Sequence, residues 1–288
     1  MITPRDRSLA PADLHVHTTH SDGSCTPCDV VRSAAAVGLS AVAVTDHDTL
    51  TGIASARVEA TRLGVELISG IELTAERDGR EIHLLGHFVR DDDPDLLAAT
   101  IALREARARR IEAMVDSLAS HGYSIDLAAL RRLFPRATIG RRHLAEWLAR
   151  TGQVSDLRAA FSELLSDHGP IQVPKPRIPW RTAIELIHGA GGTAGLAHPP
   201  RDLRQSDLAE YRSAGLDAVE VAGPRVPRSV RLRRERWAET FDLVPIAGSD
   251  FHAPDRPGRW VGSVTTPREQ VMRLRERVRS ISTAPPVD

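Results

Sequence analysis

Short apolar runs that end at a histidine or a carboxylate recur along most of the chain, and this pattern limits the possible folds more than any other feature. Each run has the length and composition of a β-strand. Side chains at strand ends in a sheet closed by helices converge on one rim, where barrel enzymes place their chemistry. Polar residues that are far apart in the sequence are therefore expected to meet at one site. The runs are residues 12–16, 41–44, 66–71, 81–85, 193–197 and 244–248.

Helical segments alternate with these runs. Residues 27–37 are predicted to form a helix because Thr26 is a suitable N-cap, Pro27 suits the first helical position and Gly38 ends the segment. The dipeptide Asp78-Gly79 between two strand-like runs predicts a hairpin. Repeated β-α units favour a parallel sheet with helices outside it. Further helices are expected at 51–63, 180–189, 206–214, 227–240 and 267–280, and further strands at 218–221 and 262–265.

The middle of the chain has a different pattern. Between about residues 94 and 175 helical periodicity dominates and no strand candidate occurs. We therefore predict a barrel domain from residues 1–93 and 176–288, interrupted by a helical insertion at 94–175. The helices of the insertion are expected at 96–121, 126–133, 141–150 and 155–166.

Composition excludes several classes of protein. A chain of 288 residues with 41% hydrophobic and 26% charged residues can bury a large core. Its 38 basic residues balance 38 acidic ones, so no overall field attracts nucleic acid or a membrane, and DNA sequence recognition is not expected. The first ten residues lack the apolar core of a signal peptide, and no run approaches 18 apolar residues. We expect a cytoplasmic protein; the sequence indicates no particular oligomeric state.

Cys25 and Cys28 have the spacing of a redox pair at the start of a helix. Such a pair usually follows a strand directly, whereas here a polar turn, residues 21–24, intervenes. Two reduced thiols near a loop are the favoured interpretation.

His15 and His17 are the strongest single indication of a metal site. In an extended segment the two imidazoles share one face, and Val16 packs behind them. Nearby, Asp22 lies in a Ser-Asp-Gly turn, where its alternative role is to hydrogen-bond its own backbone, and His20 is a rival ligand.

The sequence Thr-Asp-His-Asp places His47 between two carboxylates at the end of a strand. Carboxylates beside a ligating histidine often orient it, so His47 is the predicted ligand, with Asp46 or Asp48 behind it or near the substrate. Asp48 could instead cap a helix. Glu72 ends a buried run, where an unpaired carboxylate would be costly, and bridging two cations would remove that cost. The remaining candidates at strand ends are His83, His198, Asp250 and His252.

In their order and combination these motifs resemble the PHP family, the polymerase and histidinol phosphatase metal-dependent phosphoesterases. Specifically, the chain is similar to the bacterial branch of nucleotide phosphatases and ribonucleases, over nearly its whole length. The matching residues are 13–17, 21–23, 45–48, 70–72, 83–86, 197–199 and 248–252.

The resemblance implies an α/β fold, a distorted (β/α)7 barrel with the helical insertion as a cap over the site. It also implies two or three divalent metal ions, often manganese, iron or zinc. One metal would be held by His15, His17, Glu72 and Asp250, a second by Glu72, His83 and His198, and a third by Asp22, His47 and His252.

Four residues are predicted to contact phosphate. Arg141 and His143 lie in a stretch that resembles the Gly-Arg-Pro-His segment of this branch, with Arg142 where proline is usual. Lys175 is the only lysine of the chain and lies in a proline-flanked loop, where a compact ammonium could bind phosphate. The alternative is that this lysine has no function and has been kept by chance at a surface position. Arg201 follows His198 and is a weaker candidate.

Divalent cations would lower the pKa of a bridging water enough to supply hydroxide near neutral pH, and would polarise a phosphoryl oxygen. No nucleophile from the protein is needed. Asp48, His143 or metal-bound water could protonate the leaving alcohol. The resemblance implies removal of the 3'-phosphate of a nucleoside 3',5'-bisphosphate, or stepwise 5'-to-3' hydrolysis of short 5'-phosphorylated RNA. The substrate partner is therefore a small nucleotide or short RNA.

Three alternatives stay open on sequence grounds. Histidinol phosphate could be the substrate, although the insertion and the Ser-Asp-Gly turn favour the nucleotide branch. A non-catalytic, metal-stabilised module is a second, although each motif position retains a possible ligand. A carbon-nitrogen hydrolase is a third, although Lys175 lies in a loop and not at a strand end, where a carboxylated lysine would be expected.

Overall fold

The computed structural model describes residues 9–135, 139–166, 169–254 and 258–283. The chain divides into two compact units, one formed by Met1–Ala99 with Arg177–Asp288 and the other by Thr100–Pro176. The long helix α3, Pro94–Ser120, begins in the first unit and continues into the second. The two parts of the first unit are thus separated in sequence by the second.

One sheet organises the first unit. Its strands are hydrogen-bonded in the order β1-β2-β3-β4-β6-β7-β8, and β5 pairs with β3. Along this order neighbours are parallel, except that β4 is antiparallel to both β3 and β6. The strands are β1 (Ala12–Asp13), β2 (Ala41–Val44), β3 (Glu66–Arg77), β4 (Arg80–His87), β5 (Ile178–Pro179), β6 (Thr193–Leu196), β7 (Ala218–Ala222) and β8 (Val244–Ala247).

The sheet closes on itself through the segments that follow β1 and β8. Val16 forms a parallel bridge with Phe251. The backbone N–H of His17 donates to the carbonyl of Phe251, and that of Asp250 donates to the carbonyl of His15, both at 2.9 Å. The seven strands of the main path and this closure confirm the predicted distorted (β/α)7 barrel.

The predicted hairpin joins β3 to β4. Asp78 and Gly79 have φ angles of 52° and 75°, and Arg77 pairs with Arg80 across the turn. A two-residue turn with both φ angles positive matches the twist of the flanking strands, which explains the Asp-Gly choice. Both strands therefore extend further towards the turn than the sequence pattern predicts.

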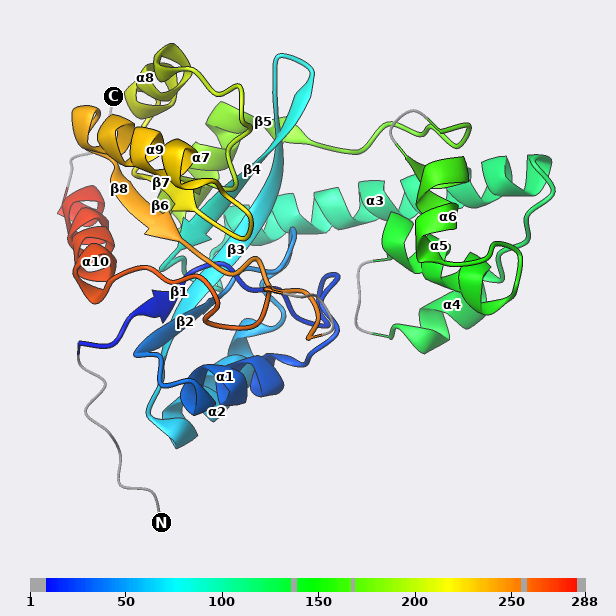
Figure 1. The fold of residues 1–288 in the computed structure, drawn as a ribbon, viewed down its shortest axis with the longest axis horizontal. Helices are drawn as coiled ribbons and strands as arrows, with labels where there is room; N and C mark the ends of the chain where they lie inside the picture. The colour runs from blue at the N-terminus through cyan, green and yellow to red at the C-terminus, as the bar shows by residue number, and fades with distance from the viewer. Residues whose placement is uncertain (1–8, 136–138, 167–168, 255–257, 284–288) are drawn as a thin grey trace. The chain divides into compact units, whose positions relative to one another are not determined.

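The helices of the first unit lie outside the strands. Figure 1 shows α1 and α2 together on one side of the sheet and α7, α8 and α9 together on another. The start of α1 is as predicted, because Thr26 and Asp29 form a capping box and Pro27 occupies the first turn. The helices are α1 (Pro27–Ala36), α2 (Ile53–Leu63), α7 (Trp180–Gly189), α8 (Gln205–Ser213), α9 (Arg228–Thr240) and α10 (Arg268–Thr283).

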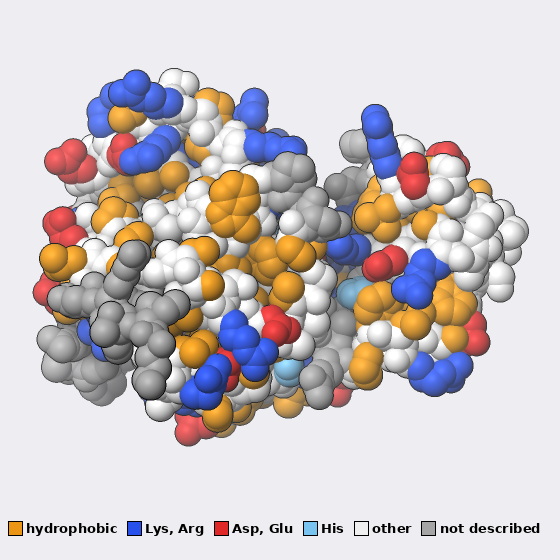
Figure 2. Space-filling model, turned by 60° about the horizontal axis from the view of Figure 1, so that its bottom comes forward, with side chains coloured by type: hydrophobic (Ala, Val, Ile, Leu, Met, Phe, Trp, Pro, Cys, Tyr) orange, Lys and Arg blue, Asp and Glu red, His pale blue; other side chains and the backbone are white. Residues whose placement is uncertain are grey.

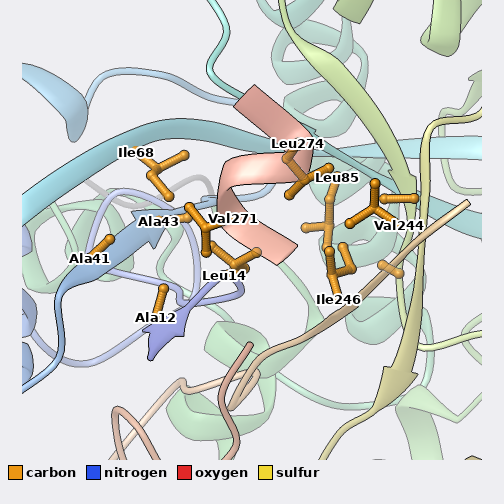
Figure 3. Packing of buried hydrophobic residues seen from close by; sticks show 12 residues of the cluster. Ala12, Leu14, Ala41, Ala43, Ile68, Leu85, Val244, Ile246, Val271 and Leu274 are labelled. Carbon is orange, nitrogen blue, oxygen red and sulfur yellow. The ribbon is translucent and has the colours of Figure 1, made fainter. Parts of the chain in front are cut away.

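The core of the barrel lies towards the amino ends of its parallel strands. Val271 and Leu274 of α10 pack against apolar side chains from the strands, and Figure 3 shows these groups converging. The strand residues include Ala12, Ala41 and Val244, each at the start of its strand or close to it. Helix α10 therefore closes the amino end, which leaves the carboxyl ends of the strands available for the polar residues.

The second unit is helical, as predicted. It contains most of α3, with α4 (Leu127–Leu133), α5 (Arg141–Arg150), α6 (Leu157–Ala160) and a π-helix, η1 (Phe161–Leu165). The sequence predicted a single helix at 155–166, whereas the chain changes from α to π geometry after Ala160. Asp126 and Asp156 cap α4 and α6 by accepting from backbone N–H groups three residues further on. A separate apolar core, which includes Met114, Leu144 and Leu165, holds these helices together.

The strand predicted at 262–265 does not form. Its backbone groups are used differently, because the Gly262 N–H donates to Asp13 Oδ2 at 2.8 Å, while Thr266 bridges Ala12. Asp13 also accepts from the Ser249 N–H at 2.9 Å, so this buried carboxylate ties β1 to two loops. The Asp13 side chain thus takes the place of the strand-to-strand hydrogen bonds that a strand at 262–265 would have made.

The face drawn in Figure 2 carries both basic (blue) and acidic (red) side chains. This distribution agrees with the equal numbers of basic and acidic residues. Among the described residues, no helix combines the length and the apolar character that crossing a membrane would require.

His87 is expected to make the fold sensitive to acid. It is completely buried and its Nε2 donates to the carbonyl of Leu14 at 2.8 Å. Burial lowers the pKa of this imidazole to about 4, whereas the unfolded chain binds the proton near 6.5. Stability is therefore lost as the pH falls below 6.5 and the loss is complete near 4, at about 3 kcal/mol.

The measurement compares denaturant unfolding of wild type and His87→Gln between pH 7.5 and 4, because glutamine can keep the donor to Leu14. The gap in unfolding free energy between the two proteins should shift in favour of the variant by about 3 kcal/mol across this range. Parallel pH curves for the two proteins would contradict the prediction.

Candidate metal centre

His15 and His17 follow β1 in the segment that closes the barrel, and both are completely buried. Because Val16 is bridged to Phe251 in an extended segment, the two imidazoles leave the backbone on the same side. Their Nε2 atoms lie 3.1 Å apart. Two nitrogen lone pairs at this distance repel unless a proton or a cation lies between them.

Glu72 lies among five imidazoles, with 1% of its side chain exposed. Its Oε1 is 2.9 Å from both His83 Nδ1 and His198 Nε2. Its Oε2 lies 3.1–3.3 Å from ring nitrogens of three others, His15, His17 and His47. The two oxygens of one carboxylate therefore face two different sets of histidines.

The expectation that Glu72 ends a strand is wrong. It lies in the middle of β3, which runs on to Arg77 because the hairpin continues beyond the rim. The chain after β2 pairs with it there, since the Asp48 N–H donates to the Glu72 carbonyl at 3.0 Å. His83 belongs to β4, which runs antiparallel to β3 and β6, so its amino half lies at the carboxyl ends of these two strands. The reversal of β4 thus brings His83 to Glu72.

The structure brings all nine predicted ligands together. They form four overlapping groups, in each of which the possible ligand atoms lie within 4.8 Å of one another. The groups differ from the implied sets, because His198 lies with His15, and His17 joins Asp22. The groups are His17, Asp22, His47 and His252; His15, His17 and Asp250; His15, Glu72 and His198; and His47, Glu72 and His83.

Buried polar atoms without a hydrogen bond show that this donor set fits cations. Four such atoms belong to the groups, namely His17 Nδ1, Asp22 Oδ1, His47 Nδ1 and Glu72 Oε2. A buried polar atom that lacks a partner costs about 1–3 kcal/mol. A mixture of imidazole and carboxylate donors suits divalent transition metals, and such ions would satisfy these atoms. The cluster is therefore a site for divalent metal.

Electrostatics couples the members of the cluster. Burial alone would raise the pKa of Glu72, but the charges of His47, His15 and His83 hold it well below its usual range. Burial would lower the pKa of His17, yet the nearby carboxylates of Asp250 and Glu72 raise it to about 10. Protons and cations compete for such nitrogens, so metal binding must displace protons and is expected to weaken in acid.

Asp22 and His252 reach the site from loops, and His252 Nε2 lies 3.4 Å from Asp22 Oδ1. The loop of Asp22 packs closely against the chain after β1. At Gly23 a Cβ atom would come within 2.6 Å of the His17 carbonyl oxygen, so only glycine fits there without a shift.

Asp46 holds the same loop in place. This buried carboxylate accepts from the Thr18 N–H at 2.7 Å and from the Ser21 hydroxyl at 2.6 Å. It therefore positions the turn that carries Asp22.

Asp48, predicted as a possible proton donor, is completely buried. Its carboxylate accepts from the Thr74 N–H at 2.7 Å and from the Thr74 hydroxyl at 2.9 Å, and its φ is 52°. These contacts fix the chain after β2 against β3. A role of Asp48 in proton transfer remains a prediction.

The four residues that are predicted to contact phosphate do not all belong to the same unit. Arg141 starts α5 and donates to the Leu165 carbonyl at 3.2 Å, and the buried His143 accepts from the Gly140 N–H at 3.0 Å. Lys175 is half-buried in the same unit, while Arg201 is exposed in the first unit. Their contacts with phosphate remain predictions.

His20 and the two cysteines lie outside the groups. His20 Nδ1 is 2.7 Å from the Thr51 hydroxyl, and among the described residues it joins no metal-binding group. Cys25 and Cys28 are free and half-buried, and burial raises the pKa of the Cys25 thiol. A raised pKa disfavours the reactive thiolate, which supports the interpretation as reduced thiols.

Some residues that the sequence analysis missed touch predicted ligands, among them Glu220 and Arg259. Glu220 of β7 is 3.0 Å from His15 Nδ1, and its position as the one charged residue in an apolar strand could have revealed it. Arg259 donates to Asp250 Oδ2 at 2.8 Å. It lies in an irregular segment without periodicity, so no local signal could have identified it.

Comparisons with known proteins agree with this geometry. The PHP domain model matches residues 13–165. A 5'-3' exoribonuclease from Haemophilus influenzae is 34% identical over 247 residues, which are 84% of this chain and 90% of that protein. A 3',5'-nucleoside bisphosphate phosphatase from Chromobacterium violaceum is 33% identical over 261 residues, 88% of this chain and 91% of that protein.

The fold has a close structural counterpart as well. A solved structure from Bifidobacterium adolescentis, assigned as a metal-dependent phosphoesterase, superposes with a TM-score of 0.85 at 30% identity, covering 92% of this chain and 96% of that one. A seven-stranded barrel with histidines and carboxylates gathered at one end defines a metal-dependent hydrolase. The chain belongs to the PHP family.

Replacing Glu72 with glutamine should remove metal. Glutamine keeps the size of the side chain but offers one weaker acceptor where two groups of imidazoles face a carboxylate. We expect at least one divalent ion per chain to be lost and kcat/KM to fall by more than about 100-fold. Elemental analysis after gel filtration measures the first effect. His20→Gln is the control, and equal metal content in Glu72→Gln and wild type would refute the prediction.

Proposed function

We propose that this chain is a metal-dependent phosphoesterase that cleaves the bond between phosphorus and the 3' oxygen of nucleotides. The proposed substrates are nucleoside 3',5'-bisphosphates, which would lose the 3'-phosphate, and short 5'-phosphorylated RNA degraded from the 5' end. Both reactions break the same bond, and only the group carried by the phosphorus differs. The relatives named for these two activities span most of the chain at similar identity.

The observation that carries the proposal is the arrangement around Glu72. Its two oxygens face separate sets of imidazoles, so each oxygen could hold a cation together with a different set. A third group, built on Asp22, His47 and His252 with His17, lies beside them. We propose two or three divalent ions, held by the nine residues of the four groups. Manganese, iron and zinc suit their imidazole and carboxylate donors.

When bound, such ions would activate water, polarise a phosphoryl oxygen and neutralise the charge that develops during in-line displacement. The residues of the chain have complementary tasks. The buried His15 and His17 hold the inner end of the site dry, whereas 47% of the His198 side chain and 31% of the Asp22 side chain are exposed. Substrate phosphate would therefore enter from the side of these exposed groups.

The leaving 3' oxygen must gain a proton as its bond to phosphorus breaks. Asp48 and His143 are the proposed donors from the chain, with water as the alternative. Asp48 is hydrogen-bonded to Thr74, and His143 Nδ1 accepts from the Gly140 N–H, so both side chains also have positioning contacts. We also propose that Arg141, His143, Lys175 and Arg201 contact the 5'-phosphate.

Removing the metal should abolish hydrolysis. After dialysis against a chelator, we expect less than about 1% of the activity to remain, because water at neutral pH is a poor nucleophile without a cation. Addition of Mn²⁺, Fe²⁺ or Zn²⁺ should restore it, and the ion that restores most identifies the preferred metal. Full activity in protein shown by elemental analysis to be metal-free would refute the proposal.

The substrate is tested with a panel at equal concentrations. It contains adenosine 3',5'-bisphosphate, a 5'-phosphorylated tetraribonucleotide, the same tetramer with a 5'-hydroxyl, and histidinol phosphate. We expect phosphate release from the first, mononucleotide release from the second and at least about tenfold slower cleavage of the third, because a charged contact to the 5'-phosphate is worth about 1.5–3 kcal/mol. Preferential turnover of histidinol phosphate, or cleavage of an amide panel alone, would overturn this assignment.

The cationic residues of the insertion are tested separately. Arg141→Ala and Lys175→Ala should each raise KM for the bisphosphate by about 10- to 100-fold, since each would remove a charge-assisted contact. Arg132→Ala, which removes an exposed arginine of α4, is the matched control. A KM unchanged in both test variants would show that the 5'-phosphate is held elsewhere.

A further inference from the structure

Glu220 is a buried charge that none of the four metal-binding groups contains. It lies in β7, whose other residues are alanine and valine, and it is 4% exposed. Burying a carboxylate costs several kcal/mol unless it is paired and hydrogen-bonded. Its contacts therefore indicate why the chain keeps a charge at this point of the barrel.

Both oxygens of Glu220 act on predicted metal ligands. Oε1 lies 3.0 Å from His15 Nδ1, and Oε2 accepts from the backbone N–H of His198. The first contact makes Nδ1 of His15 the protonated nitrogen and turns its Nε2 lone pair towards Glu72, His17 and Asp250. The second fixes the position from which the His198 side chain leaves the backbone.

These two ligands belong to the same metal-binding group. His15, Glu72 and His198 have ligand atoms within 4.8 Å of one another, and they come from segments that follow β1, form β3 and follow β6. Glu220, on β7, bonds to the first and the third. A single carboxylate therefore contacts two ligands that follow different strands, β1 and β6.

The backbone at His198 needs such support. Its φ is 24°, an unfavourable value for a residue other than glycine, and it precedes a proline. Arg234 of α9, 3% exposed, donates from Nη2 to the carbonyl of Pro199. Glu220 and Arg234 thus hold the two sides of this strained turn with buried charged groups of opposite sign.

We propose that Glu220 is a positioning residue for the metal centre, which orients His15 through its ring and His198 through its backbone and thereby sets the affinity for one divalent ion. The inference rests on the proposed metal site and names a residue on which its affinity depends. It needs both oxygens, because each serves a different ligand.

The test is Glu220→Gln. Glutamine has one oxygen and one NH₂ group, so in either orientation one of the two donors, His15 Nδ1 or the His198 N–H, faces another donor. Calorimetric titration of the metal-free protein with Mn²⁺ should show a 10- to 100-fold weaker Kd for one site. In activity assays, the Mn²⁺ concentration for half-maximal rate should rise by the same factor, and most of the lost activity should return at high Mn²⁺.

Asp217→Asn is the matched control. Asp217 is also a buried carboxylate, next to the start of β7, that pairs with a histidine, since its Oδ2 lies 2.8 Å from His188 Nε2 and accepts from the Ala194 N–H. None of these residues joins a metal-binding group among the described parts of the chain. This variant should lose unfolding free energy like Glu220→Gln but keep the wild-type Kd for Mn²⁺.

Each outcome decides between the inference and the function on which it rests. If wild type binds no Mn²⁺, the proposed metal site itself fails. If wild type binds and Glu220→Gln has the same Kd, or if Asp217→Asn weakens binding equally, the positioning role is refuted. Should Glu220→Gln not fold, Glu220→Asp is titrated instead; its shorter chain cannot reach both donors, so an unchanged Kd would equally refute the inference.

Discussion

A carboxylate shielded from water among five imidazoles is the constraint on which the rest of the structure depends. Glu72 could not be buried in this position unless positive charge were supplied on both sides of it. Its oxygens face two sets of histidines, and the five histidines come from four separate segments of the chain. Every segment that carries one of these histidines must therefore reach the same site, and the barrel is the architecture that allows it.

The fold and the site use the same backbone contacts. The hydrogen bonds that close the barrel join His15 and His17 to Asp250 and Phe251, so closure itself places ligands from the two ends of the sheet side by side. Asp48, His198 and Asp250 adopt positive φ values next to the site. Such strain persists only where surrounding contacts over-determine the backbone, and buried partners such as Thr74 and Glu220 supply those contacts.

Much of this could be predicted from local signals. The Thr26-Pro27 start of α1 and the Asp78-Gly79 hairpin depend on side chain and backbone preferences within a few residues, and both form as expected. Predictions that depended on partners elsewhere were less accurate. Residues 262–265 do not pair as a strand, because Asp13 takes the Gly262 N–H, and Glu72 lies inside β3 because pairing with β4 extends that strand.

The sequence by itself determined the alternation of strands and helices, the helical insertion and the nine residues expected at the rim, because periodicity and residue type are local properties. Only the tertiary structure decided which of these residues share a group, since β4 runs against its neighbours and brings His83 to Glu72. The same holds for Glu220. Its role depends on contacts with His15 and His198, which are 205 and 22 residues away in the sequence, so no local pattern reveals it.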